Sequence, residues 1–261
     1  MIGTALVIPL VLSACHMPEN PSFPLTIKGA REDLRAMAKA PKALERPVVV
    51  LAGFFDPGFA SGKAAEMLRD ATGDGEHVVS VSFLTTSTFD QCRARVIEAV
   101  EKKFPSDDPS CSVEVDVVGI SMGGLVGRYC AAPAMSADDG KRLVVRRLFT
   151  IGSPHRGADM AKLPTLDKRQ LKMRAGSDFL AHLDDAHIGY EIVPYVRLGD
   201  TIVGERNAAP VGVTPWWVTN EPLELAHMQA FDDPRIICDI ARRLRGDEPW
   251  TSAPAEPLPN K

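Results

Sequence analysis

Five short apolar runs, most of them rich in β-branched residues, alternate along the chain with segments of helical character. The runs are RPVVVLAG (46–53), HVVSVSF (77–83), SVEVDVVGI (112–120), RRLFTIG (146–152) and EIVPYVRLG (191–199). A continuous apolar run is typical of a strand buried on both faces of a parallel sheet, and strands that alternate with helices form βαβ units. The pattern therefore predicts an α/β fold with a mostly parallel, doubly wound sheet flanked by helices.

The helices predicted between these runs have recognisable boundaries. They are expected over residues 29–40, 62–69, 87–104, 123–132 and 235–244. Ser61 is the expected N-cap of the second helix, and Ser87 begins a sequence with the spacing of a capping box for the third. Asp233 followed by Pro234 is a typical helix start, and Gly246 is a typical helix end.

The chain has 261 residues, which is enough for one large domain or two small ones at roughly 100–200 residues each. The predicted divisions are a signal peptide over 1–14, a proline-rich tether over 15–27, a single domain over 28–246 and a disordered tail over 247–261. Within the domain, the stretch at about 156–190 lacks a clear strand but separates two strands. It is therefore a candidate cap or lid.

The N-terminal run MIGTALVIPLVLSAC is too short to span a bilayer and has the character of a secretory signal. Its last four residues, Leu12 to Cys15, resemble the bacterial lipobox, although no Lys or Arg precedes the apolar run. The resemblance implies that Cys15 is lipidated and anchors an exported protein to a membrane of the cell envelope. The alternative is ordinary cleavage after Ala14, which would give a secreted protein with a free Cys15.

Charge and cysteine usage argue against several classes of partner. Thirty Lys and Arg against 34 Asp and Glu give a net charge of −4 without any basic stripe, so no nucleic-acid partner is expected. Cys92, Cys111, Cys130 and Cys238 show neither a C-x-x-C pair nor the Cys/His spacing of a zinc site, so no metal or cofactor is expected. Cys130 and Cys238 lie in apolar helical patterns and are expected to be buried free thiols.

The motif GISMG (119–123) lies between a predicted buried strand and a predicted helix. A lone G-x-S-x-G occurs by chance in roughly one chain in ten of this size. A sharp strand-to-helix turn, however, exposes a serine and places it at a helix N-terminus, where backbone N–H groups stabilise negative charge. The context therefore favours Ser121 as a nucleophile, which needs a base and an acid that orients the base.

The base is sought among six histidines, and the acid between the serine and the histidine in chain order. His227 lies in a loop ahead of the last helix and is the preferred base, the alternative being a solvent-facing loop histidine. Asp200 directly follows a predicted strand and is the preferred acid. The backbone N–H groups of Met122 and Phe54 are the expected oxyanion donors, although GFF could also be an ordinary turn.

Taken together, these segments resemble the α/β-hydrolase fold, and within it bacterial lipases and related serine esterases. The resemblance covers roughly residues 46–244 and is carried by VDVVGISMGGLVGRY (115–129), RLFTIGSPHRGA (147–158), RAGSDFLAHL (174–183), GDTIVGERNAA (199–209) and LELAHMQAFDDPRI (223–236). It implies the same five site residues, and it places His155 near the site but outside the triad. The chain has Ala52 and Ile120 where many relatives have histidine.

The prediction is a serine carboxylic ester hydrolase that works through a Ser-His-Asp triad and an acyl-enzyme. The apolar loop after the first strand and the short excursion suggest acyl chains bound beneath a small lid, as in lipases. The alternatives are an esterase for small esters, an acyltransferase and a catalytically silent surface lipoprotein. The expected partners are an ester or lipid substrate, water and, through the anchor, a membrane, and the protein is expected to be a monomer.

Overall fold

The six strands in the part of the chain that the structure describes run parallel in one sheet of order β2-β1-β3-β4-β5-β6. The computed structural model describes residues 18–135, 140–186, 189–221 and 223–260. The strands are β1 (Val48–Leu51), β2 (Val78–Val81), β3 (Cys111–Ile120), β4 (Arg142–Ile151), β5 (Glu191–Arg197) and β6 (Trp216–Val218). The predicted α/β class and parallel sheet are therefore confirmed. Only β6 was not predicted, because three residues are too few to show a periodic pattern.

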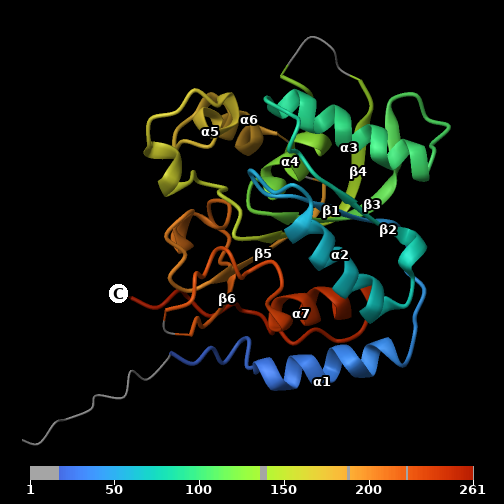
Figure 1. Ribbon diagram of the computed structural model, residues 1–261, viewed down its shortest axis with the longest axis vertical. Helices are drawn as coiled ribbons and strands as arrows, with labels where there is room; N and C mark the ends of the chain where they lie inside the picture. Colours follow the sequence, from blue (N-terminus) through green and yellow to red (C-terminus); the bar gives the residue numbers. More distant parts are fainter. Residues whose placement is uncertain (1–17, 136–139, 187–188, 222, 261) are drawn as a thin grey trace, which may run out of the picture.

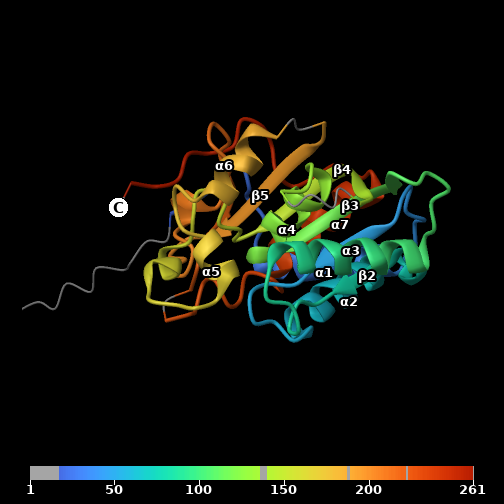
Figure 2. The ribbon, with the colours of Figure 1, turned by 90° about the horizontal axis from the view of Figure 1, so that it is seen from above.

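Helices cover both faces of the sheet (Figures 1 and 2). They are α1 (Ile27–Ala38), α2 (Phe59–Thr72), α3 (Phe89–Lys103), α4 (Met122–Ala131), α5 (Lys168–Lys172), α6 (Asp178–Asp185) and α7 (Pro234–Arg245). Successive strand residues point to opposite faces. Along β1, Val48 and Val50 pack in the core with α1, α2 and α7, whereas Val49 and Leu51 pack in the core with α3, α4 and α6.

Two of the predicted helix caps are wrong. Helix α2 begins at Phe59, and the carboxylate of Asp56 accepts hydrogen bonds from the amides of Gly58, Ala60 and Ser61. The Asp56 carboxylate thus pairs with amides of the first turn that have no partner within the helix, so that the helix begins two residues before the predicted cap Ser61. At α3 the cap is Thr88, whose hydroxyl accepts from the Gln91 amide.

The last helix begins and ends where the sequence predicts. Asp233 accepts a hydrogen bond from the Arg235 amide, and Pro234 occupies the first turn. Gly246 ends the helix in the left-handed conformation, with φ of 65°. Because this φ is costly for residues with a Cβ, glycine is the expected residue here.

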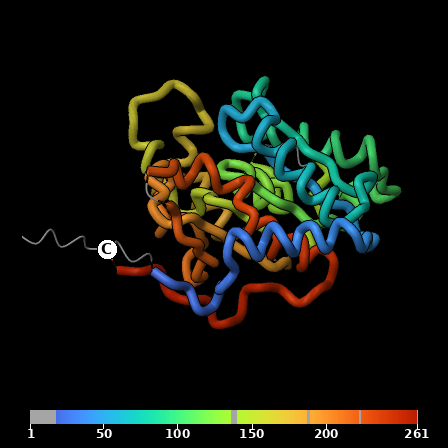
Figure 3. Tube along the Cα trace, turned by 60° about the horizontal axis from the view of Figure 1, so that its bottom comes forward, coloured from blue at the N-terminus to red at the C-terminus, as the bar shows by residue number. Residues whose placement is uncertain are grey.

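Both ends of the described chain pack against the domain, which differs from the predicted tether and disordered tail. In the N-terminal arm, Phe23 is buried and packs edge-on against Tyr195. In the tail, the amides of Trp250 and Thr251 donate to the buried carboxylate of Asp239. The sequence prediction missed these contacts because a polar, proline-rich composition does not reveal partners far away in the chain (Figure 3).

The excursion between β4 and β5 contains helices α5 and α6 and packs beside α3 and α4. The ring of Phe179 in α6 stacks on Phe89 of α3 with ring centres 4.0 Å apart and meets Tyr129 of α4 edge-on. Its function as a cap or lid remains a prediction.

Cys92, Cys111, Cys130 and Cys238 are all free thiols, and Cys130 and Cys238 are buried as predicted. Burial raises the pKa of Cys130 to about 12. Within the described ranges, no helix has the length and apolar character needed to cross a bilayer. The predicted signal peptide and Cys15 lie outside the described residues.

Candidate active site

Ser121 lies in the sharp turn between β3 and α4 at the carboxyl edge of the sheet. Its backbone is strained, with φ of 51° and ψ of −120°, a conformation that non-glycine residues rarely adopt. The Ser121 amide donates to the carbonyl of Ile151 at 2.8 Å, which ties the turn to the end of the neighbouring strand β4. The turn therefore presents the Ser121 side chain at a fixed point above the sheet.

The glycines on either side of Ser121 are required by space. A Cβ at Gly119 would lie 2.4 Å from the Gly124 nitrogen, and a Cβ at Gly123 would lie 2.4 Å from the Leu51 carbonyl oxygen. Both obstacles are backbone atoms, which cannot rotate away. Helix α4 can thus follow β3 and pack this closely on β1 only without side chains at these two positions.

His227 bridges Ser121 and Asp200. Its Nε2 lies 3.0 Å from the Ser121 hydroxyl oxygen, and its Nδ1 lies 2.7 Å from Oδ2 of Asp200. Because an ionised carboxylate only accepts hydrogen bonds, Nδ1 carries the hydrogen and Nε2 is left to accept the serine proton. The structure thus brings together the three side chains predicted from the sequence, in a serine–histidine–aspartate chain of hydrogen bonds.

Asp200 is held by the loop that follows β5. Its Oδ1 accepts hydrogen bonds from the amides of Ile202 and Val203, both at 2.9 Å, so that Oδ2 remains for His227. The side chain is buried, which keeps water from competing for the histidine.

The two predicted oxyanion donors lie on either side of the serine. Met122 is the first residue of α4, so helix geometry provides no partner for its amide. Gly53 packs against the serine, since a Cβ there would lie 3.3 Å from the Ser121 Cβ. Within the described part of the chain, the amide of the next residue, Phe54, donates no hydrogen bond. Phe55 has a φ of 60°, which for a bulky residue stores strain in this loop.

No protein-family model matches the chain, and neither does any curated protein. Among solved structures, the product of the gene lin2722 from Listeria innocua matches with a TM-score of 0.52 and 15% identity, over 78% of this chain and 95% of that one. Phospholipase PlaB from Legionella pneumophila, in complex with thio-NAD, matches with a TM-score of 0.50 and 12% identity, over 76% of this chain. This chain spans only 58% of the PlaB chain.

The chain has an α/β-hydrolase fold. At these identities the likeness concerns the fold alone. In the α/β-hydrolase fold, the elbow between β3 and α4 and the loops after β5 and β6 lie at the same edge of the sheet, because all the strands are parallel. This topology explains how residues separated by 106 positions, Ser121 and His227, can meet.

His155 is fully buried between α4 and the end of β4, and within the described ranges no hydrogen bond joins its ring to Ser121, Asp200 or His227. Its Nδ1 lies 3.4 Å from a guanidinium nitrogen of Arg128, and its Nε2 lies 3.0 Å from the Thr150 hydroxyl. Burial and the charges of Arg128 and Arg156 lower the pKa of His155 well below its ordinary value. His155 is therefore a neutral side chain that connects α4 to the end of β4.

Two positions where the sequence resemblance raised the expectation of histidine, Ala52 and Ile120, are filled by core residues. Ala52 is fully buried, and Ile120 is 7% exposed and packs in the core between the sheet and α1, α2 and α7. In this α/β-hydrolase fold, both positions contribute to packing beneath the site.

Exposed apolar side chains gather in the segments that follow the carboxyl ends of the strands. This apolar rim consists of Phe55, Phe59, Leu84, Met160, Leu163, Leu166, Val211, Leu223, Leu225 and Met228. These residues come from the connections after β1, β2, β4, β5 and β6, all of which leave the edge that carries Ser121. Exposed large apolar side chains thus recur in the connections at the edge that carries Ser121.

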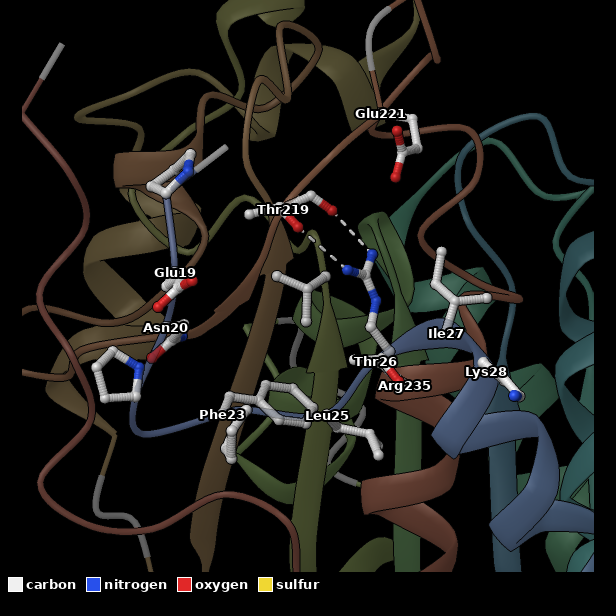
Figure 4. A pocket seen from close by; sticks show the side chains of 14 residues that line it. Glu19, Asn20, Phe23, Leu25, Thr26, Ile27, Lys28, Thr219, Glu221 and Arg235 are labelled. Atoms are coloured by element: carbon white, nitrogen blue, oxygen red, sulfur yellow. Dashed lines mark hydrogen bonds between the residues drawn. The ribbon is translucent and has the colours of Figure 1, made fainter. Parts of the chain in front are cut away.

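A cavity of about 670 Å³ lies elsewhere, between the N-terminal arm, the end of β6 and α7 (Figure 4). Its walls include Phe23, Leu25 and Arg235, but none of Ser121, Asp200 and His227. Across the described residues, no group of three or more His, Cys, Asp or Glu side chains could hold a metal ion.

Two charged residues near the site were not predicted from the sequence. Arg169 of α5 is 4% exposed and stacks over the Phe54 ring, and Arg197 at the end of β5 is 4% exposed and contacts the loop that carries His227. Neither belongs to a local motif, so only the folded arrangement reveals them.

Proposed function

We propose that the protein is a serine carboxylic ester hydrolase in which Ser121 is the nucleophile, His227 the general base and Asp200 the acid that orients it. The observation that carries the proposal is the hydrogen-bonded chain from Asp200 through His227 to Ser121, with distances of 2.7 and 3.0 Å. Both lie within the range that proton transfer between a nucleophile and its base requires.

In the proposed reaction, the Ser121 oxygen attacks the ester carbonyl carbon while His227 Nε2 takes the hydroxyl proton. Asp200 stabilises the resulting imidazolium. Collapse of the tetrahedral intermediate breaks the bond to the alkoxy oxygen, which leaves as an alcohol with the proton from His227. Water, deprotonated by His227, then attacks the acyl-enzyme and releases the carboxylic acid and the free serine.

The negative oxygen of the tetrahedral intermediate would be bound by the backbone N–H groups of Met122 and Phe54. Support comes from the position of Met122 at the N-terminus of α4, where the helix dipole also favours negative charge. The close approach of Gly53 to Ser121 puts the Phe54 loop beside the same point. One such donor typically contributes about 2.7–4 kcal/mol to transition-state stabilisation.

We infer that the substrates are esters with long acyl chains, so that the enzyme is lipase-like. The apolar rim supports this substrate class, because exposed side chains such as Phe55, Leu166 and Leu225 would contact a hydrocarbon chain or a lipid aggregate. An enzyme for small, soluble esters would have no use for so broad an apolar edge.

Ester hydrolysis by wild type, Ser121→Ala and Ser87→Ala tests the proposal. Ser87 lies exposed at the start of α3, so its replacement controls for loss of a serine. We expect wild type and Ser87→Ala to hydrolyse p-nitrophenyl esters and to react with a fluorophosphonate probe, and Ser121→Ala to do neither. A Ser121→Ala protein as active as wild type would overturn the assignment.

A series of acyl lengths, measured with and without an oil–water interface, tests the substrate class separately. Rates that rise with chain length and with the interface would support a lipase-like enzyme. Higher activity on short, dissolved esters would favour the small-ester esterase. Added alcohols that divert the acyl group from water would instead indicate an acyltransferase, and a wild type inert to the probe would indicate a silent protein.

We further propose that Cys15 carries a lipid anchor and that the protein is exported to the cell envelope, as the N-terminal sequence suggests. Labelling with palmitate in cells should mark wild type and be lost in Cys15→Ser. Equal labelling of both proteins would contradict the anchor and leave the ester hydrolase proposal untouched.

A further inference from the structure

Arg197 is a buried charged residue close to the candidate site. It is the last residue of β5, lies three positions before Asp200 and is only 4% exposed. Burying a guanidinium costs free energy unless the group is paired and hydrogen-bonded. The partners of Arg197 therefore indicate why the fold retains a charge at this position.

Two of these partners flank His227 in the chain. One terminal nitrogen of Arg197 forms an ion pair with the carboxylate of Glu224, three residues before the histidine. The other donates to the side-chain oxygen of Gln229, two residues after it, at 3.3 Å. The forked guanidinium thus contacts the histidine loop, of which the structure describes residues 219–221 and 223–233, on both sides of the catalytic base.

A third contact joins Arg197 to the end of the same loop. Its Nε lies 3.4 Å from Oδ2 of Asp233, the N-cap of α7. Asp233 also pairs with Arg235, which donates to the carbonyl of Thr219 at 2.8 Å, where the loop begins (Figure 4). The start, middle and end of the histidine loop are therefore bound to one network of charges, in which Arg197, Asp233 and Arg235 are buried and Glu224 is half-buried.

The loop otherwise holds its shape through the hydrogen bonds of its turns, such as those from the Gln229 amide to the Leu225 carbonyl and from the Ala230 amide to the His227 carbonyl. Among its described residues, the loop contains turns but no helix or strand between β6 and α7. Phe231 packs against the core, but the large apolar side chains nearer to the histidine, Leu223, Leu225 and Met228, are exposed. Over this stretch, apolar packing thus provides little to fix the histidine ring.

We propose that Arg197 is a positioning residue, which fixes the His227 ring between Ser121 and Asp200 by binding Glu224 and Gln229. The inference rests on the proposed function, because it assigns Arg197 a role in the hydrolysis carried out by Ser121. Arg197 itself touches neither the substrate nor the reacting atoms. Lysine could not replace it, since a single ammonium group lacks the planar fork that contacts two acceptors at once.

Kinetics of Arg197→Met and Arg197→Lys test this role. Displacement of the base by about 1 Å can cost about 100-fold in rate, so we expect kcat for a p-nitrophenyl ester to fall by about that factor in Arg197→Met while KM changes by less than about threefold. Arg197→Lys should recover little of the loss. Added guanidinium chloride at non-denaturing concentration should restore part of the Arg197→Met activity.

Arg245→Met is the matched control. Arg245 is 8% exposed and donates to the carbonyls of Ala71 and Ala40, far from the histidine loop in the fold. The Arg245→Met variant should have a lower Tm than wild type, as Arg197→Met should, but its kcat should equal that of wild type. A stability effect common to both variants is thereby separated from the effect on catalysis.

Glu224→Gln and Gln229→Ala provide a second route if Arg197→Met does not fold, because Gln229 is exposed and Glu224 is only half-buried. Each substitution should lower kcat, and the double variant should lose nearly as much kcat as Arg197→Met. A folded Arg197→Met enzyme, or a folded double loop variant, with kcat within twofold of wild type would overturn the inference. Such a result leaves the proposed function intact as long as Ser121→Ala remains inactive.

Discussion

The guanidinium carbon of Arg169 lies 4.8 Å from the centre of the Phe54 ring. Arg169 also donates hydrogen bonds to the carbonyl of Phe83 and the hydroxyl of Thr86, both at 3.2 Å. The excursion between β4 and β5 is thereby joined to the loops that follow β1 and β2. One of these loops carries the proposed oxyanion donor, so the excursion can support catalysis without covering the serine.

Replacing Arg169 with methionine should lower kcat by about tenfold. The substitution removes the cation from the Phe54 ring, an interaction of about 0.5–2 kcal/mol, and lets the Phe54 amide move away from the developing oxyanion. Steady-state kinetics on a p-nitrophenyl ester measure the effect. Arg174→Met is the control, because Arg174 donates to Ala161 and Leu163 within the same excursion. Equal rates for both variants would refute a role for the Phe54 contact.

Gly123→Ala and Gly62→Ala should have opposite effects. The methyl group at position 123 would lie 2.4 Å from the Leu51 carbonyl oxygen, whereas no atom lies within 4 Å of the corresponding point at Gly62 in α2. We expect Gly123→Ala to unfold at lower denaturant concentration and to lose activity. Gly62→Ala should gain about 0.5–1 kcal/mol of stability and keep its activity. Equal unfolding curves would show that the elbow can relax.

Asp200→Asn should lower kcat by about 10⁴-fold, because an amide at this position can favour the wrong tautomer of His227. The backbone contacts of Ile202 and Val203 with Oδ1 can persist, so the loop should keep its shape. Asp178→Asn removes an exposed carboxylate that pairs with Lys172 in the excursion, and its kcat should equal that of wild type. A nearly active Asp200→Asn enzyme would point to another acid.

Asp33 should contribute to stability in a defined pH window. Burial alone would raise its pKa, but hydrogen bonds from Arg242, Trp250 and Cys238 outweigh burial and lower the pKa from 3.8 to about 2. A lowered folded-state pKa stabilises the protein above the unfolded value, and this contribution is lost as the pH falls from about 4 towards 2.

Urea unfolding of wild type and Asp33→Asn, at several values between about pH 5 and pH 2, measures this contribution. The difference in free energy of unfolding between the two proteins should shrink as the pH falls. Glu32→Gln, which removes an exposed carboxylate from the same helix, controls for the change in net charge. A difference that stays constant with pH would contradict the role of Asp33.

Local patterns were sufficient to predict most of the sheet but not the ends of the chain. The run that became β1 is apolar over its whole length, and the buried end of β3, residues 115–120, is apolar apart from Asp116 and Gly119. Apolar runs of this kind are typical of strands buried on both faces of a sheet. Strand β6 (Trp216–Val218) has only three residues, which is too short for a recognisable apolar run. The tail from residue 247 was predicted as disordered because its stabilising partner, Asp239, lies in a helix whose pattern shows only that it is amphipathic.

The candidate triad could be predicted because a parallel sheet brings the ends of its strands to one edge, and chain order then selects Asp200 and His227. Arg169 could not be predicted in this way. Its partner Phe83 is 86 residues away, and no spacing rule links the two positions. Residues that support a site from the side are fixed by tertiary contacts, which a single sequence does not display.

The positions of the two chain ends have a consequence for self-association. Strand β6 is an edge strand of the sheet, and the unpaired backbone groups of an edge strand can pair with a strand from another molecule. Here the side chain of Asn20 donates to the Trp217 carbonyl at 2.7 Å, and the Trp217 indole donates to the Glu256 carbonyl at 2.9 Å. The Ser252 amide in turn donates to the Ser22 carbonyl, which fastens the two segments to each other. These two segments of the described chain thus lie against β6, and Asn20 occupies the Trp217 carbonyl, a group that a strand from another molecule would need for pairing.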